Sequence, residues 1–229
     1  MSFILNRSFL ACLMISLSLF GCHKPLSETP EDLCLTLLND NCINKIIKVK
    51  MYTSKGEVIL ELNAELAPLT ASNFLLLVEK GFYEGTIFNR VIRRPYPFII
   101  QGGYKDLSYN LKSSLKSKDE SYIKKKESFS INQIPLEIKL KGEDKPRYNK
   151  LISKYDDFNR IELNHRRGAL AMARSQLLNS ANIEFYISLK DLPELDGRYA
   201  VFGRVADGMN VVDSLNEGDL ILNMKVIKN

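Results

Sequence analysis

The chain has 229 residues, 45% of them apolar, and a formal net charge of +5. This length supplies one ordinary globular domain with extensions and excludes two full domains. The surplus charge lies in residues 104–160, which hold fourteen Lys and Arg against nine Asp and Glu. We interpret it as a solvated Lys-rich surface; an acidic partner such as nucleic acid or lipid head groups is the alternative. The run from Lys124 to Lys126 lacks interleaved aromatics for base stacking, so we expect no nucleic-acid binding.

Residues 1–21 are typical of an export signal, with a positive charge at Arg7 followed by an apolar run at 9–20. The run is too short to span a bilayer comfortably, which disfavours the alternative of a permanent transmembrane helix. The Leu-Phe-Gly-Cys segment that ends at Cys22 resembles the lipobox of bacterial lipoproteins, although Phe20 replaces the usual small residue. The resemblance implies cleavage before Cys22, acylation of that cysteine, and a lipid-anchored protein that faces the periplasm or the cell exterior.

Residues 22–44 are interpreted as a tether with a short helix, because polar residues and two prolines precede a brief apolar stretch at 33–38. Cys34 and Cys42 are the cysteines left once the signal and the lipidated residue are set aside. An exported compartment allows them to form a local disulfide, and two unpaired thiols are the alternative. The two histidines of the chain have no Cys or carboxylate cluster at ligand spacing, so we expect no metal site.

Two patterns follow in residues 45–83. Residues 46–62 alternate apolar and polar side chains about a Ser-Lys-Gly turn, which predicts a β-hairpin. Residues 67–83 then change to helical spacing, with a proline near the first turn and Gly81 at the end. These signals predict one helix of about three turns.

Beyond this helix the pattern is mostly that of short strands. Residues 104–160 lack sustained periodicity and are interpreted as a long surface insertion with a short ordered island at 133–138. A second short helix is predicted at 208–216. Strands are predicted at 86–92, 97–103, 168–174, 183–189 and 199–205. Strands around two isolated helices favour a mainly β, closed or nearly closed antiparallel barrel over alternating βαβ units.

Five segments form a specific signal when they are taken in order, although each alone is weak. The segments are residues 53–92, FIIQGG at 98–103, HRRGALAMAR at 165–174, EFYISL at 184–189 and LDGRYAVFGRVADGMNVVD at 195–213. In this order they resemble the signature blocks of the cyclophilin family of peptidyl-prolyl cis-trans isomerases. The resemblance implies a closed antiparallel eight-stranded barrel capped by two α-helices, in a domain at 45–229 that contains the insertion. It also implies a hydrophobic proline pocket on one outer face of the barrel.

The chemistry that such a pocket must perform can be stated independently. Rotation about a peptide bond meets a barrier of about 18–20 kcal/mol, and X-Pro bonds are the ones with an appreciable cis population. A catalyst must hold the proline ring and place a donor where amide resonance is lost. A guanidinium suits that task because it stays charged and offers several donors in one plane. By resemblance Arg90 is the catalytic arginine; an ordinary exposed strand arginine is the alternative.

The resemblance also assigns substrate-binding positions in the pocket and groove. These are Phe98, Ile99, Gln101, Ala173, Glu184, Tyr186, Leu195 and Tyr199. Phe98 would form the aromatic wall, Ile99 its aliphatic neighbour, and Gln101 the hydrogen bond to the substrate backbone. Taken alone, Phe98 and Ile99 would be ordinary core residues of a strand. Tyr186 replaces the usual phenylalanine, so its hydroxyl must find a partner or water.

Several rim positions depart from the family pattern. Histidine is common at the positions of Asn89 and Tyr199, and glutamine at that of Glu184. An aromatic residue is common at the position of Glu194, and eukaryotic members often have asparagine at that of Arg174. The run RRPYP at 93–97 lengthens the link between Arg90 and Phe98 by about three residues. These departures predict a proline pocket that is retained with an altered rim.

We expect an isomerase that acts on unfolded or proline-containing polypeptides during folding of exported or envelope proteins. A cyclophilin-like module that binds such segments, or a partner protein, without catalysis is the alternative. The reaction needs no cofactor, and none is expected. We further expect a monomer that is held at the membrane through its lipid anchor on Cys22.

Overall fold

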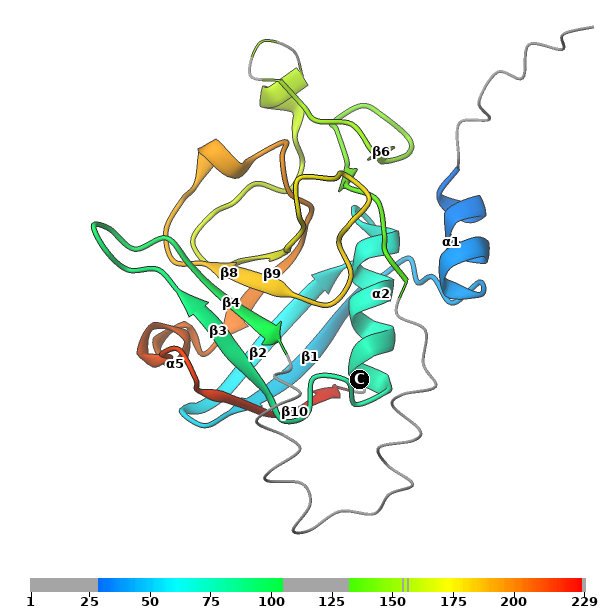
Figure 1. Ribbon diagram of the computed structural model, residues 1–229. Coiled ribbons are helices and arrows are strands. Elements are labelled where there is room, and N and C mark those ends of the chain that lie inside the picture. The colour runs from blue at the N-terminus through cyan, green and yellow to red at the C-terminus, as the bar shows by residue number, and fades with distance from the viewer. Residues whose placement is uncertain (1–28, 105–131, 154, 156, 228–229) are drawn as a thin grey trace, which may run out of the picture.

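The computed structural model describes residues 29–104, 132–153, 155 and 157–227 (Figure 1). The predicted export signal and Cys22 lie outside these residues. Eight strands close into an antiparallel barrel in the order β1, β10, β3, β4, β8, β7, β9, β2, and β5 pairs with β6 separately. The main helices are α2 (Pro68–Glu79) and α5 (Met209–Ser214). The predicted fold class, a mainly β closed eight-stranded barrel with two covering helices, is therefore confirmed.

The barrel strands fall close to the predicted segments. They are β1 (Ile46–Thr53), β2 (Gly56–Asn63), β3 (Thr86–Val91), β4 (Ile99–Tyr104), β7 (Ala169–Met172), β8 (Phe185–Ser188), β9 (Val201–Asp207) and β10 (Leu220–Val226). In the predicted hairpin, Val49 pairs with Leu60 and Met51 with Val58, and all four side chains are fully buried. Since alternate residues of a strand face opposite sides, this pattern places one apolar row of each strand inside the barrel.

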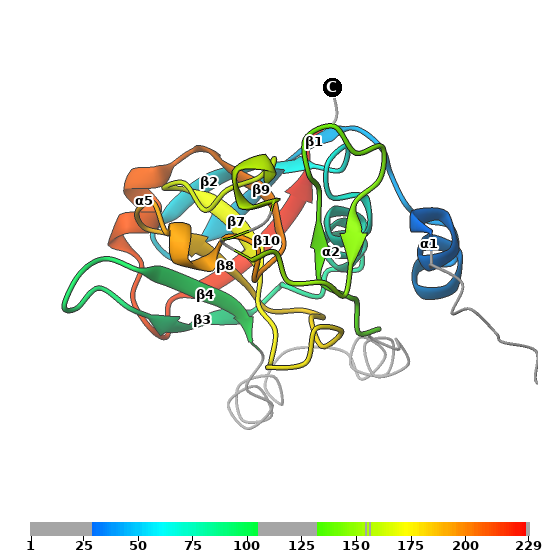
Figure 2. The same cartoon turned by 90° about the horizontal axis from the view of Figure 1, so that it is seen from above.

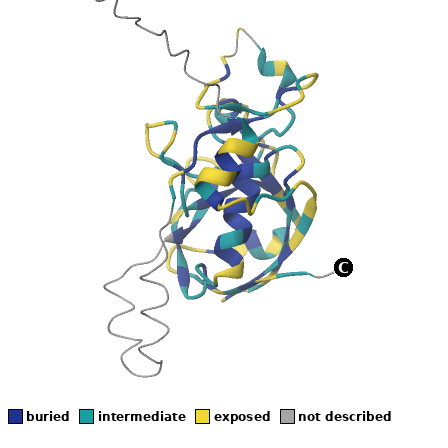
Figure 3. Ribbon diagram, turned by 90° about the vertical axis from the view of Figure 1, so that its right-hand side faces the viewer, coloured by how far each residue is buried: buried dark blue, intermediate teal, exposed yellow. Residues whose placement is uncertain are grey.

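Helix α2 closes one end of the barrel, and most of it is buried (Figure 3). Phe74 lies at the centre of the contact, with its ring centroid 5.0 Å from that of Tyr83, 5.4 Å from that of Phe185 and 5.2 Å from that of Phe202. Aromatic pairs at such distances add to the free energy gained by burying their area. Phe74 therefore ties the helix to strands that are far apart in sequence.

Strand β10 is the one barrel strand that the residue pattern did not locate. Its inward-facing residues are Ile221 and Met224, three positions apart instead of two. The pairing with β1 shifts register here, because Tyr52 lies opposite Asn223 and Thr53 opposite Ile221. A bulge inserts an extra residue into one strand and so breaks the two-residue alternation on which strand prediction depends.

The second half of the predicted insertion is more ordered than a surface excursion with a short island. Residues Leu136, Ile138, Leu140, Ile152 and Ile161 form a buried apolar cluster with Ala200. The short strands β5 (Glu137–Ile138) and β6 (Arg147–Tyr148) lie beside α2 (Figure 2), and 3-10 helix η1 (Asp157–Arg160) follows. The buried residues sit in two-residue strands and turns, so no long periodic run marked them in the sequence.

Glu137 joins this segment to α2. Its side chain is buried, with 1% exposed, and its carboxylate accepts hydrogen bonds from the Leu69 and Thr70 amides at 3.1 and 2.8 Å. The Tyr148 hydroxyl donates to the same carboxylate at 2.7 Å. Ala67, at the N-cap position, offers no side-chain acceptor. Glu137 therefore supplies the missing helix cap from a distant part of the chain.

Helix α1 (Pro30–Leu38) packs on α2 from the outside (Figure 2). Cys34 and Cys42 form a disulfide, which decides between the two alternatives left by the sequence. The chain beyond the helix is held by a hydrogen bond from the Ile43 amide to Ser72 Oγ at 2.9 Å. Within the part of the chain that the structure describes, no helix is long and apolar enough to cross a membrane.

Candidate active site

The site is built on one row of residues that crosses four adjacent strands of the barrel. Arg90 of β3 pairs with Gln101 of β4, Gln101 with Tyr186 of β8, and Tyr186 with Ala171 of β7. Residues directly opposite each other in a sheet project from the same face. The sheet thus brings a guanidinium, an amide and an aromatic ring together on the outside of the barrel.

A bulge in β3 gives Arg90 this outward direction. Phe88 pairs with Gly102 and Arg90 with Gln101, so Asn89 is the extra residue between them. Phe88 is fully buried inside the barrel, whereas Arg90 is exposed, although simple alternation would place both on one face. Gly102 makes room for the arrangement, because a Cβ there would lie 2.7 Å from the Phe88 ring.

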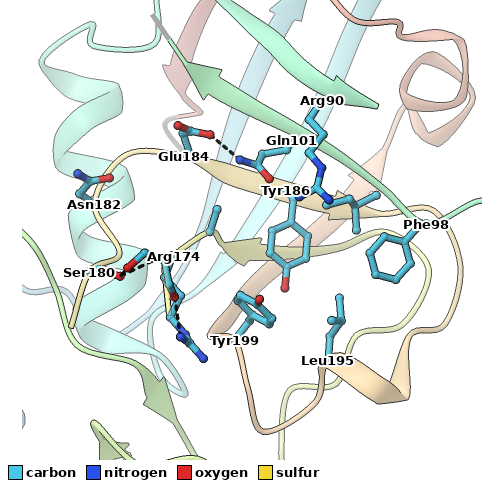
Figure 4. Close-up of a pocket in the computed structure, with 13 residues that line it drawn as sticks. Arg90, Phe98, Gln101, Arg174, Ser180, Asn182, Glu184, Tyr186, Leu195 and Tyr199 are labelled. Atoms are coloured by element: carbon cyan, nitrogen blue, oxygen red, sulfur yellow. Dashed lines mark hydrogen bonds between the residues drawn. The ribbon is translucent and has the colours of Figure 1, made fainter. Parts of the chain in front are cut away.

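The nine residues predicted from the sequence to be catalytic or substrate-binding all line a single pocket of about 450 Å³ (Figure 4). The lining contains Arg90, Phe98, Ile99, Gln101, Ala173, Arg174, Ser175, Ser180, Asn182, Glu184, Tyr186, Leu195 and Tyr199. The pocket has an apolar end at Phe98 and Leu195 and a polar end at Glu184 and Asn182 (Figure 4). No group of three or more His, Cys, Asp and Glu side chains suited to a metal occurs among the described residues.

The apolar end is the surface of a second, smaller core that covers the outside of the sheet. The buried members of this outer core include Ile99, Ala171, Tyr186, Leu192 and Val201. Phe98 and Leu195 pack against them. The neighbouring residues of the same strands, such as Ile100 and Phe185, face the inner core. Ile99 is therefore a core residue and a pocket wall at once, while Phe98 is half-buried and available to a ligand.

Glu184 organises the polar end. Its Oε2 accepts hydrogen bonds from Gln101 Nε2 and, at 3.3 Å, from Asn89 Nδ2. An ionised carboxylate can only accept, so Gln101 must present its amino group to Glu184. The Gln101 carbonyl oxygen then faces the Tyr186 side of the pocket (Figure 4), where it can accept a hydrogen bond from a peptide N–H.

The hydroxyl of Tyr186 has a protein partner. It lies 2.8 Å from His165 Nε2, and His165 Nδ1 lies 2.7 Å from Asp196 Oδ1. Burial raises the pKa of Tyr186 well above its ordinary value, so the hydroxyl keeps its proton. Tyr186 is 3% exposed and its ring meets that of Tyr199 edge-on at 5.9 Å. The side chain therefore presents a ring to the pocket, as phenylalanine would.

The sequence did not select four lining residues at the polar end: Arg174, Ser175, Ser180 and Asn182. Arg174 donates to the Arg198 carbonyl at 3.0 and 2.6 Å, and its guanidinium carbon lies 4.9 Å from the Tyr199 ring centroid. Arg174 had a sequence signal as a departure at the rim, whereas the other three are marked only by their place in the link between β7 and β8. Glu194, at a position where an aromatic residue is common, is exposed and does not line the pocket.

The additional residues between β3 and β4 extend this hairpin beyond the pocket. Ile92 and Ile99 continue the ladder, with the Ile92 amide donating to the Ile99 carbonyl at 2.9 Å. Arg93 donates to the carbonyls of Asp213 and Leu215 at 2.7 and 2.8 Å, at the end of α5. The longer link is thus anchored to the barrel, and Phe98 still reaches the pocket wall.

Comparison with known proteins agrees with this geometry. A family model described as cyclophilin type peptidyl-prolyl cis-trans isomerase/CLD matches residues 48–229. A peptidyl-prolyl cis-trans isomerase of Streptomyces antibioticus is 33% identical over 175 residues, covering 73% of this chain and 81% of the relative. A probable peptidyl-prolyl cis-trans isomerase of Brucella suis is 28% identical over 218 residues, covering 95% and 88%. A longer Synechocystis relative is 32% identical over 190 residues, or 78% of this chain and 46% of the relative's length.

Solved structures show the same architecture. The cyclophilin AquaCyp293 of Hirschia baltica matches with a TM-score of 0.54 at 22% identity, over 86% of this chain and 80% of that one, which supports the fold alone. A cyclophilin type peptidyl-prolyl cis-trans isomerase of Cryptosporidium parvum, solved in the presence of the dipeptide Ala-Pro, matches with a TM-score of 0.54 at 25% identity, over 80% and 99%. The chain therefore belongs to the cyclophilin-type peptidyl-prolyl cis-trans isomerase family.

Proposed function

We propose that this protein catalyses cis–trans isomerisation of X-Pro bonds, with Arg90 as the catalytic donor. The observation that carries the proposal is a guanidinium at the edge of an apolar pocket that has no competing partner among the described residues. No residue that the structure describes forms a hydrogen bond or an ion pair with the Arg90 side chain. All of its donors are therefore available to a bound peptide.

The pocket supports a division of roles among its residues. The apolar end, between Phe98 and Leu195, is the place for a proline ring, and the Cryptosporidium parvum relative was solved in the presence of a proline-containing dipeptide, Ala-Pro. Gln101 would hold the substrate backbone through its carbonyl oxygen. Arg90 would donate to the prolyl amide as the bond twists and resonance is lost, which stabilises the transition state more than the planar ground states.

An isomerisation assay on a short Ala-Pro peptide tests this proposal, with the fragment 23–229 and its Arg90→Ala and Arg90→Lys variants side by side. We expect Arg90→Ala to lower kcat/KM about a hundredfold, the scale of one lost donor to the transition state, while the peptide still binds. Arg90→Lys keeps the charge but loses the planar donors, so its kcat/KM should fall between those of the wild type and of Arg90→Ala. A folded wild-type fragment that binds the peptide without turnover would leave a non-catalytic proline-binding module as the function.

We also propose that the substrates are exported or envelope proteins and that a lipid on Cys22 holds the enzyme at a membrane. The export-type pattern of residues 1–21 and the lipobox-like segment support this assignment. The Cys34–Cys42 disulfide supports it independently, because such bonds persist in oxidising compartments.

Fractionation of a bacterial host that expresses the full chain tests the anchor. The wild type should sediment with membranes and release only with detergent. Cys22→Ala should abolish the acylation-dependent mass increase of the mature protein. A Cys34→Ala/Cys42→Ala variant is the matched control, since it removes two cysteines without touching the lipobox-like segment. Membrane association of the wild type without any acyl group on Cys22 would contradict the proposal.

A further inference from the structure

Behind the pocket wall lies a buried chain of hydrogen bonds that the proposed reaction does not use directly. The chain is Tyr186–His165–Asp196, with contacts of 2.8 Å from Tyr186 Oη to His165 Nε2 and 2.7 Å from His165 Nδ1 to Asp196 Oδ1. The His165 side chain is fully buried and that of Asp196 is 6% exposed. The imidazole and the Tyr186 ring are nearly parallel, at an interplanar angle of 11°.

Chemistry fixes the direction of the bond between His165 and Asp196. The Asp196 carboxylate also accepts from the His165 backbone amide at 2.7 Å and from Asn164 Nδ2 at 3.1 Å. Because a carboxylate only accepts, Nδ1 of His165 carries the proton that faces Asp196. The other ring nitrogen, Nε2, is then left for the Tyr186 hydroxyl, which lies 2.8 Å away and can either donate or accept there.

The same chain joins two separate walls of the pocket. Tyr186 lies on β8, whereas Asp196 directly follows Leu195, at the end of 3-10 helix η2 (Pro193–Leu195). The His165 carbonyl also accepts from the Leu192 amide at 2.8 Å, at the start of the η2 segment. One imidazole therefore sets the position of the β8 wall relative to the η2 wall.

From this geometry we propose that His165 is a positioning residue for the proline pocket, acting through the hydroxyl of Tyr186. The inference rests on the proposed function and deepens it, because it names the residue that binds the Tyr186 hydroxyl and so lets the ring serve as an apolar wall of the pocket. A buried hydroxyl without a partner is unfavourable. Without Nε2 the Tyr186 ring would shift until its hydroxyl found another partner or water, and the proline pocket is the open space beside it.

A double-variant comparison tests this role, because it distinguishes an effect that acts through the Tyr186 hydroxyl from a general effect on folding. The variants are His165→Phe, Tyr186→Phe and the two combined, with unfolding midpoints measured so that binding is compared only on folded protein. We expect His165→Phe to raise the Kd of a short Ala-Pro peptide, measured by NMR titration, and the KM about tenfold, with kcat within about twofold. When Tyr186→Phe is already present, the same substitution should change Kd and KM less than about twofold, because no hydroxyl remains to be satisfied.

Asn164→Ala provides the matched control. It removes a hydrogen bond to Asp196 but none to Tyr186, so it should lower the unfolding midpoint without changing the Kd for the peptide. A His165→Phe effect of equal size in both backgrounds would mean a purely structural role and would overturn the proposal. Wild type that binds the peptide without turnover would overturn the isomerase function while the Kd comparison still decides the role of His165. Wild type that neither binds nor turns over the peptide would overturn both.

Discussion

Two carboxylates shape this apolar pocket because a carboxylate can only accept hydrogen bonds. Glu184 can only accept, so it fixes which end of the Gln101 amide faces the pocket. The carboxylate of Asp196 fixes the imidazole of His165 in the same manner. Neither acceptor lines the apolar end of the pocket. Two of the departures from the family pattern, Glu184 and the hydroxyl of Tyr186, therefore have hydrogen-bond partners within the protein.

Glu184→Ala should change substrate binding more than turnover. Removing the carboxylate leaves the Gln101 amide free to rotate, so its carbonyl oxygen is no longer held toward the peptide N–H. A hydrogen bond of this kind is worth about 1 kcal/mol, which corresponds to a KM about fivefold higher with kcat nearly unchanged. Steady-state isomerisation kinetics measure the separate effects on KM and kcat.

Glu194→Ala is the control for the loss of one negative charge near the site, because Glu194 is exposed and outside the pocket lining. It should leave KM and kcat within about twofold of the wild type. Equal effects of the two substitutions would show that general electrostatics, and not the hold on Gln101, determines binding.

At the scale of elements, helix α2 depends on a cap from residue Glu137, which is 68 and 67 positions away from the amides that it accepts. Burial raises the pKa of Glu137 above its ordinary value, with the hydrogen bonds from Thr70, Tyr148 and Leu69 opposing the rise. The folded protein thus binds this proton more tightly than the unfolded chain does. The contribution of Glu137 to stability is therefore fully present below the pKa that it has in the unfolded chain, and it is lost as the pH rises through the pKa that it has in the folded protein.

Glu137→Gln removes this titration and turns an amino group toward one of the donors. We expect the free energy of unfolding to fall by about 1–3 kcal/mol, because buried donors lose their acceptor. The difference in the free energy of unfolding between the variant and the wild type should be largest in acid, near and below the ordinary Glu pKa of 4.5, and should decrease toward neutral pH. Urea unfolding at several pH values measures both. A difference that increases from acid to neutral pH would contradict the assigned direction of the pKa shift.

The Cys34–Cys42 disulfide should stabilise helix α1 locally and leave the barrel unchanged. It closes a short stretch with a sequence separation of 8. The loop-entropy relation gives about 2–3 kcal/mol for a loop of this length. Cys34→Ser/Cys42→Ser should therefore speed hydrogen exchange in Pro30–Leu38, with the exchange of β1 and β2 and the isomerase activity unchanged. Loss of protection throughout the barrel would show instead that α1 is part of its cooperative unit.

The sequence could predict elements whose signal is local. The hairpin of β1 and β2 was predicted because its inward residues alternate strictly, and α2 because a proline, a helical stripe and Gly81 mark its course. Strand β10 was not located because the bulge near Leu222 separates its inward residues by three positions. The cap by Glu137 and the bond between Tyr186 and His165 could not be predicted, because each joins segments that only the folded barrel brings together.

At the scale of the whole molecule, the barrel has an inner core and the pocket has an outer one, and both use the same strands. In β7, Leu170 and Met172 face inward while Ala169 and Ala171 face the outer core. In β8, Phe185 and Ile187 face inward while Tyr186 forms the pocket wall. This explains why both strands are buried along their whole length. The part of the pocket wall that β7 and β8 supply is therefore part of the barrel itself.

This shared construction predicts that substrate binding and barrel unfolding are one cooperative event. In urea, the loss of affinity for an Ala-Pro peptide should follow the same transition as the loss of β-sheet signal in circular dichroism. A peptide at about 100 times its Kd should raise the free energy of unfolding by about 2.7 kcal/mol, the full linkage value for a ligand that binds only the folded state. Removal of α1 or its disulfide should leave that increment unchanged. Affinity lost at lower urea than the sheet signal would mean that the outer core can open on its own, and the pocket would then be a separate unit laid on a barrel that persists without it.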